Sequence, residues 1–187
     1  GTNFFSLSYY GFMRPDVLIS YLFPHVEMEW FIQGYAIFEI LLGGGLLYYW
    51  LHRKGFSDFT SFACGFFYLS ANCFFQAHRQ IMFVNYMPFL FLALISIEKK
   101  NFVAFTLCGS LIVLHSYFYC IGCFIVCFIY LLYRHPGEWK KLFVSYILIV
   151  LLTAILTIPT LLVILGNGKS GASTQLASLF IPSLNLK

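Results

Sequence analysis

Charged side chains are scarce in this chain. Lys and Arg together number 11 and Asp and Glu 7 among 187 residues, or 10%, whereas hydrophobic residues make up 60%. Soluble domains carry about 25% charged residues, so this composition argues against a soluble domain and predicts an integral membrane protein. The net charge of +4 is small and the basic residues lie in short connectors, which argues against a nucleic-acid partner.

The motifs of several common enzyme classes are missing. The chain has no H-E-x-x-H, no G-x-S-x-G and no complete phosphate loop. Gly168-Lys169-Ser170 resembles the end of a phosphate loop, but the leading glycine is absent and a long apolar run precedes it. The motifs therefore predict no bound cofactor, and they leave the need for a divalent metal open.

Cysteine is present, but its spacing gives little indication of a metal site. Cys120 and Cys123 form a C-x-x-C, and no second pair of ligands accompanies it. All the cysteines lie within apolar runs, where small residues allow close helix packing. We predict the same packing role for Gly43-Gly44-Gly45, and no metal site. The cysteines are Cys64, Cys73, Cys108, Cys120, Cys123 and Cys127.

Long apolar runs predict an all-α, polytopic transmembrane bundle with about six spans. Seventeen residues at ~1.5 Å of helical rise approach the ~30 Å thickness of a bilayer core. The run 102–133 would make a helix of about 48 Å, so we expect it to break at His115-Ser116-Tyr117 into two short spans. Pro159 predicts a kink in the last span. The spans are expected near residues 30–51, 60–75, 81–97, 102–115, 117–133 and 142–165.

Both ends of the chain are predicted to lie outside the bundle. Residues 1–29 contain no run long enough to span, and 17–23 suits an interfacial or re-entrant helix that ends at Pro24. Residues 166–187 are predicted to be an outer exit loop that is truncated. Because the chain opens at Gly1 without Met and shows no signal peptide, we expect an internal piece of a longer protein.

The basic residues predict an orientation for this bundle. Three connectors on one side hold seven of the eleven basic residues, and the positive-inside rule makes that side cytoplasmic. The opposite, outer side then holds residues 1–29, the polar stretch 76–80 and the turn at 115–119. The seven basic residues are Arg53, Lys54, Lys99, Lys100, Arg134, Lys140 and Lys141.

The outer side gathers the residue types of an anion pocket. Arginines pair with phosphate oxygens, histidines donate hydrogen bonds, and tyrosines stack on a sugar ring or line a lipid groove. The other interpretation is that His78 and Arg79 only cap a hairpin and touch phospholipid headgroups. The candidates are Arg14, Arg79, His25, His78, His115, Tyr117 and Tyr119, with Tyr9, Tyr10, Asp16 and Lys169 at similar depth.

Glu39 is the one carboxylate predicted to lie well inside a span. It follows Trp30 by about 14 Å of helix, and an ionisable group at that depth usually faces a cavity or a partner. We therefore treat it as a functional candidate. The other interpretation is a protonated carboxyl hydrogen-bonded to Asn72 or Asn85.

Several short sequence blocks follow one another in order along nearly the whole chain. The blocks are Gly1-Thr2-Asn3-Phe4 followed by Ser6-Leu7-Ser8, Leu22-Phe23-Pro24, Phe67-Tyr68-Leu69-Ser70, His78 leading to Tyr86-Met87-Pro88-Phe89 and Ile97-Glu98, Ser116-Tyr117-Phe118-Tyr119, and Ile158-Pro159. Each is loose alone, but their order and spacing resemble the YfhO family of bacterial polytopic membrane proteins, which are placed with glycosyltransferases of the GT-C fold.

The resemblance implies a multi-pass enzyme of the bacterial cell membrane. Such an enzyme transfers a sugar from a polyprenyl-phosphate carrier to a cell-envelope polymer, such as lipoteichoic acid, on the outer face. The family's acidic general base precedes the Gly-Thr-Asn-Phe block and so would lie upstream of Gly1. Asp16 is the nearest carboxylate present, at a position that does not match that acid. His78 matches a family histidine and, with Arg79, is expected to contact the donor phosphate.

Two other functions remain open at this point. A transporter or flippase of lipid-linked sugars would use the same outer pocket and would need Glu39 to line or couple a path. A non-catalytic scaffold subunit would tolerate replacement of His78 and Arg79.

Overall fold

The computed structural model describes residues 14–75, 85–117 and 119–158, apart from the side chains of 72–75. Within these ranges every regular element is helical, so the fold is all-α. The elements are α1 (Pro15–Ser20), α2 (Met28–Arg53), α3 (Asp58–Phe75), α4 (Met87–Glu98), α5 (Phe102–His115), α6 (Cys120–Arg134), the 3₁₀ turn η3 (Pro136–Glu138) and α7 (Trp139–Leu152).

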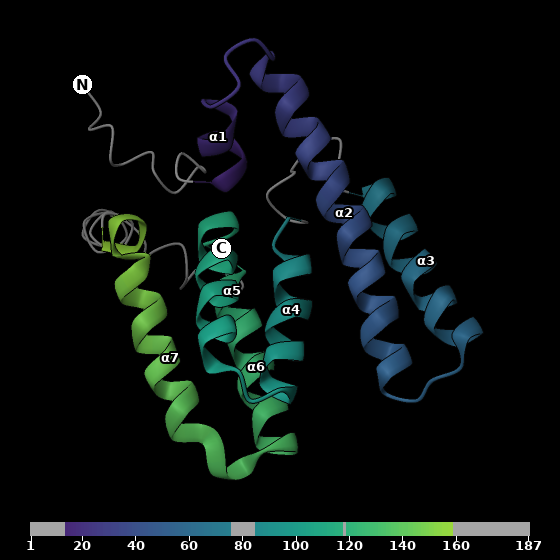
Figure 1. The fold of residues 1–187 in the computed structure, drawn as a ribbon, viewed down its shortest axis with the longest axis vertical. Coiled ribbons are helices and arrows are strands. Elements are labelled where there is room, and N and C mark those ends of the chain that lie inside the picture. Colours follow the sequence, from purple (N-terminus) through teal and green to yellow (C-terminus); the bar gives the residue numbers. More distant parts are fainter. Residues whose placement is uncertain (1–13, 76–84, 118, 159–187) are drawn as a thin grey trace, which may run out of the picture.

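The long helices run alternately down and up the molecule (Figure 1). Three connectors therefore lie at the lower end in this view: the one between α2 and α3, the one between α4 and α5, and the one between α6 and α7. All seven basic residues assigned to the cytoplasmic side lie in or beside these three connectors. The helix α1 lies at the opposite, upper end, where it packs on α2 and touches α5.

The helix boundaries fall near the expected ranges, with three differences. The helix α1 begins at Pro15 and ends at Ser20, because proline is favoured in the first turn of a helix. The helix α7 begins at Trp139, three residues early, and its regular α-helix is interrupted at Thr153. Residues 154–158 are helical again, and the predicted end of the span near 165 lies outside the described residues. The helix α4 begins at Met87, while 81–84 and Pro159 lie outside the described residues.

The break expected near His115 coincides with the end of α5, and α6 starts at Cys120. The helices from α4 to α7 contain 12 to 15 residues and so extend only about 18 to 22 Å. Among the described helices, α2 is the one that is both long and apolar enough to cross a membrane.

The apolar core lies between α4, α5, α6 and α7. Phe105, Ile112, Leu131, Leu142 and Ile149 are completely buried there. One face of α6 contributes three cysteines to the same cluster, in agreement with the packing role predicted for them. These are Cys120, Cys123 and Cys127.

The glycine run of α2 allows close packing against α3. A methyl group on Gly43 would lie 2.4 Å from the Tyr68 hydroxyl, and one on Gly44 would lie 2.9 Å from Leu69 Cδ2. Gly45 faces open space. Two of the three glycines therefore serve the packing role that the sequence predicted.

A hydrogen-bond network ties α2, α4 and α6 together at the lower end. The Glu98 carboxylate accepts hydrogen bonds from Trp50 Nε1, at 3.2 Å, and from the Tyr130 hydroxyl, and it forms an ion pair with Lys54. Burial raises the pKa of Glu98, but the bonds from Lys54 and Tyr130 outweigh burial, so its pKa lies below the ordinary value. This network fixes the end of the bundle that carries the basic connectors.

Candidate functional site

Four ionisable side chains meet at the upper end of the bundle, between α1, α2 and α5. Arg14 is 8% exposed, Asp16 0%, Glu39 1% and His115 2%. Burying charged groups is costly unless they are paired, so such a group is a candidate site when it lies inside an apolar bundle. We refer to these four residues as the upper polar cluster.

Glu39 and His115 lie side by side within this cluster. His115 Nε2 is 3.0 Å from Glu39 Oε1, and His115 Nδ1 is 2.8 Å from the carbonyl oxygen of Leu111. A carbonyl only accepts hydrogen bonds, so Nδ1 carries a hydrogen. Nε2 faces the Glu39 carboxyl group, so the two side chains form one buried acid–base pair.

Aromatic rings cover this pair. The Tyr35 ring stacks nearly parallel to the His115 ring, with centroids 6.2 Å apart and planes 9° apart. The Phe89 ring lies 4.7 Å from the His115 ring on another side. Tyr35 lies one turn before Glu39 on α2, which brings its hydroxyl to the carboxyl group. These rings fix the orientation of the imidazole and shield it from solvent.

Arg14 and Asp16 form a separate pair beside Glu39. Arg14 Nε donates to Asp16 Oδ1 at 3.0 Å, and Arg14 Nη2 donates to Asp16 Oδ2. Both carboxylate oxygens are thus engaged by one guanidinium, an arrangement that fixes the geometry of the pair.

Acidic and basic side chains are matched in number in the upper polar cluster. The Asp16 carboxylate pairs with the Arg14 guanidinium, and the Glu39 carboxyl pairs with the His115 imidazole. Such a site suits hydroxyl groups better than a bare phosphate. The expected phosphate contacts, His78 and Arg79, lie outside the described residues, as do Tyr9, Tyr10 and Lys169.

Asn85 is a polar residue near this cluster that has no partner within the described residues. It is 1% exposed, and neither Nδ2 nor Oδ1 has a hydrogen bond there. It lies just before α4, one turn from Phe89, which contacts His115. A buried amide in this state is suited to hydrogen-bond a ligand hydroxyl.

The structure brings some of the predicted site residues together and leaves others apart. Arg14, Asp16, Glu39 and His115 converge, although the sequence did not pair Glu39 with His115. Of the alternative partners for Glu39, Asn85 is wrong, because it makes no hydrogen bond to the carboxyl and His115 lies there instead, and the Asn72 side chain lies outside the described residues. The signal that could have found the pair is that both are ionisable groups at a similar predicted depth.

The remaining aromatic and histidine candidates lie around the cluster. Tyr119 stacks on Tyr86, with centroids 5.5 Å apart, and Tyr117 is half-buried in the turn after His115. His25 is exposed in the turn between α1 and α2. No group of three His, Cys, Asp or Glu side chains within the described ranges is arranged to hold a metal ion.

No protein-family model, curated protein or solved structure matches the chain. The geometry of the upper polar cluster is therefore the basis for assigning a function.

Proposed function

We propose that this chain belongs to a multi-pass, GT-C-like glycosyltransferase of the bacterial cell membrane. It moves a sugar from a polyprenyl-phosphate donor to a cell-envelope polymer, such as lipoteichoic acid, on the outer face. The observation that carries this proposal is the upper polar cluster, which lies at the end of the bundle opposite the basic connectors. The resemblance to the YfhO family supplies the donor and the acceptor class.

Exposed apolar side chains support a position in the membrane. Phe59 is 80% exposed, Phe67 70% and Ile121 63%. Large contiguous apolar surfaces are rare on soluble monomers, whereas lipid tails cover them favourably. The same holds for Ile37 and Phe38 on α2, which are 59% and 60% exposed on the one helix that meets the span test.

The transfer step places specific demands on the protein. An acceptor hydroxyl attacks the anomeric carbon, a carbon–oxygen bond forms, and the bond from that carbon to the donor phosphate oxygen breaks. The lipid phosphate leaves, and the hydroxyl proton passes to a base. In the proposed enzyme that base precedes Gly1, and His78 and Arg79 contact the phosphate. Glu39 and Asn85 hydrogen-bond sugar hydroxyls, and His115, whose two ring nitrogens are engaged by Leu111 and Glu39, positions the Glu39 carboxyl.

The test uses the full-length protein in liposomes with a labelled polyprenyl-phosphate sugar and a teichoic-acid acceptor. Glu39→Gln keeps the side-chain shape but removes the carboxylate, so transfer efficiency should fall roughly tenfold to a hundredfold, as expected for lost charged hydrogen bonds. His78→Ala and Arg79→Ala should abolish transfer. His52→Ala, at an exposed position at the opposite end of the bundle, is the matched control and should retain activity. Absence of transfer by the parent protein, or full activity of Glu39→Gln, contradicts the proposal.

The buried acid–base pair of Glu39 and His115 favours one other function. A flippase of lipid-linked sugars would use such a pair to couple movement of its substrate to movement of a proton. In the same liposomes, movement of the labelled lipid between leaflets that follows an imposed proton gradient, without transfer to polymer, would establish the flippase and exclude the transferase.

A further inference from the structure

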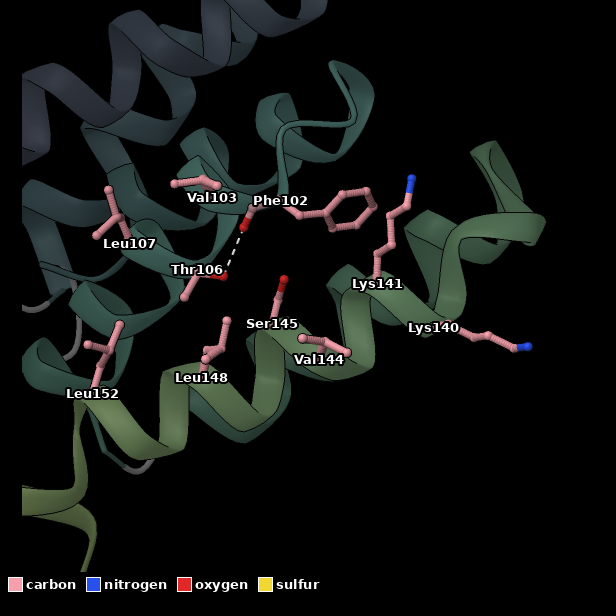
Figure 2. Close-up of a pocket in the computed structure, with 10 residues that line it drawn as sticks. All are labelled: Phe102, Val103, Thr106, Leu107, Lys140, Lys141, Val144, Ser145, Leu148 and Leu152. Atoms are coloured by element: carbon pink, nitrogen blue, oxygen red, sulfur yellow. Dashed lines mark hydrogen bonds between the residues drawn. The ribbon is translucent and has the colours of Figure 1, made fainter.

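An apolar groove runs between α5 and α7 at the lower half of the bundle (Figure 2). Its volume is about 500 Å³, within the range of small-molecule sites. Leu107, Val144, Leu148 and Leu152 line it and remain 45% to 60% exposed. Thr106 and Ser145 form its floor and are 7% and 3% exposed. The Thr106 hydroxyl donates to the carbonyl of Phe102, so it does not make the groove polar.

The groove has the length of one membrane leaflet. On α7 it extends from Lys140 to Leu152, which corresponds to about 18 Å of helix. Half of the ~30 Å hydrocarbon core is ~15 Å, so the groove matches a single extended acyl chain rather than a molecule that crosses the bilayer. Figure 2 shows that the apolar side chains of α5 and α7 face each other across it.

The lower end of the groove is basic. Lys140 and Lys141 lie there, and Figure 2 shows their amino groups extending from the end of α7. Lys141 pairs with Glu138 at 2.9 Å, and Lys100 lies close to the same carboxylate. Two lysines, Lys141 and Lys100, thus lie near Glu138, and Lys140 adds a third positive charge at this end, which leaves a net positive rim. Trp139 adjoins Lys140, as is typical of a membrane interface.

We propose that this groove binds an anionic phospholipid of the cytoplasmic leaflet, with one acyl chain between α5 and α7 and the phosphate on Lys140 and Lys141. A groove of leaflet length that ends in unbalanced positive charge complements a lipid with an apolar tail and a negative headgroup. A neutral phospholipid offers the same tail without the charge. This inference shares the membrane position with the proposed function, but it does not depend on sugar transfer.

The experiment measures lipid retention by the full-length protein in native mass spectrometry. The protein is equilibrated in detergent with equal amounts of phosphatidylglycerol and phosphatidylcholine that carry identical acyl chains. We expect phosphatidylglycerol to be retained preferentially. The double variant Lys140→Gln and Lys141→Gln should lower its retention roughly tenfold or more, because each surface lysine contributes to anionic-lipid binding. Leu148→Trp fills the groove and should remove the bound lipid.

Matched controls separate the groove from general charge and hydrophobicity. The pair Arg53→Gln and Arg134→Gln removes two positive charges from the same end of the bundle, outside the groove. Ile129→Trp enlarges an exposed apolar residue on α6. Both controls should retain phosphatidylglycerol as the parent does. Thermal unfolding of every variant verifies that it is folded.

A photoreactive group at the acyl terminus of phosphatidylglycerol provides a second readout, and it should label α7 near Leu152. Equal retention of the two lipids, equal losses in the control variants, or labelling confined to helices other than α5 and α7 would overturn the proposal. A groove filled by another segment of the full-length chain would give no retention and no labelling, which also overturns it. No sugar donor is present, so failure of the transferase assay leaves this result unchanged.

Discussion

At the scale of single residues, Glu39 and His115 stabilise each other inside the bundle. Their side chains are 1% and 0% exposed, so removal of either leaves the other buried without its partner. We expect Glu39→Leu and His115→Leu each to lower the free energy of unfolding by about 3 kcal/mol.

The double variant separates this coupling from simple packing loss. With both groups replaced, no polar atom of the pair remains buried, so the double variant should lose clearly less stability than the sum of the single variants. Unfolding in detergent micelles measures all three values, and additive losses would show that the two residues are not coupled.

Glu98 is expected to make the thermal stability of the folded protein depend on pH. Its pKa in the folded protein lies below the ordinary value of 4.5, because the hydrogen bonds from Lys54 and Tyr130 outweigh the effect of burial. A carboxylate of this kind contributes its full stabilisation above the unfolded pKa and loses it as the pH falls through the folded pKa. Below about pH 4.5 the parent protein should therefore lose thermal stability.

The Glu98→Gln variant tests this assignment. It should have a lower thermal midpoint than the parent at about pH 6, and it should show a smaller further loss on acidification, because Gln does not titrate. The thermal midpoints of both proteins between about pH 3 and pH 6 provide the measurement. If the thermal midpoints of the two proteins fall in parallel on acidification, carboxylates other than Glu98 cause the acid sensitivity. Variants of Asp58 and Glu138, which are also paired, would then be compared in the same way.

Residue types were more predictable than residue pairs. Glu39, His115, Arg14 and Asp16 stood out because ionisable groups are rare in such a sequence. Their pairing depends on how α1, α2 and α5 meet in space, which periodicity alone does not give. The connectors predicted that Lys54 and Glu98 lie at the same end of the bundle. They did not predict that the two residues belong to one hydrogen-bond network.

At the scale of helices, the two glycines Gly44 and Gly45 offer a matched comparison. A methyl group at Gly44 would lie 2.9 Å from both Leu69 Cγ and Leu69 Cδ2, whereas one at Gly45 meets nothing within 4 Å. Gly44→Ala should therefore push α3 away from α2 and cost about 1 kcal/mol or more. Gly45→Ala should be neutral or stabilise the helix by up to about 1 kcal/mol, since alanine is the better helix former.

Unfolding of both variants under one condition gives the difference directly. If Gly44→Ala is as stable as Gly45→Ala, then α3 has enough freedom to adjust and the close approach is not required.

The helix boundaries could be predicted where the length of an apolar run exceeded the thickness of a bilayer. A single helix over 102–133 would have been too long for a bilayer, so the sequence demanded a break, and α5 does end at His115. The interruption of α7 at Thr153 was not predicted. The Thr153 hydroxyl donates to the carbonyl of Ile149 at 2.8 Å, a local hydrogen bond that hydropathy does not register.

At the scale of the whole molecule, the alternating helices predict that two turns far apart in the sequence lie on the same side of the membrane. Gly55 lies between α2 and α3, and Gly137 lies between α6 and α7, both at the end that carries the basic connectors. His25 lies at the other end. Single cysteines placed at Gly55 and Gly137 should react with a membrane-impermeant maleimide only after permeabilisation, and one at His25 should react in intact cells.

Native cysteines lie within helices, so a version of the protein with these replaced by alanine or serine provides the background for this labelling. Opposite accessibility of positions 55 and 137 would contradict the antiparallel order of the helices. Protection of position 25 in intact cells would contradict the assigned outer face.

The Glu39–His115 pair also sets a time order for biosynthesis. The two residues are separated by roughly 75 positions, and a ribosome adding about 5 to 20 residues per second makes Glu39 some 4 to 15 s before His115. During that interval α2 exists with a carboxyl group whose histidine has not yet been synthesised. The part of α2 around Glu39 therefore reaches its final surroundings only after α5 has been made, whereas its contacts with α3 and α4 can form earlier.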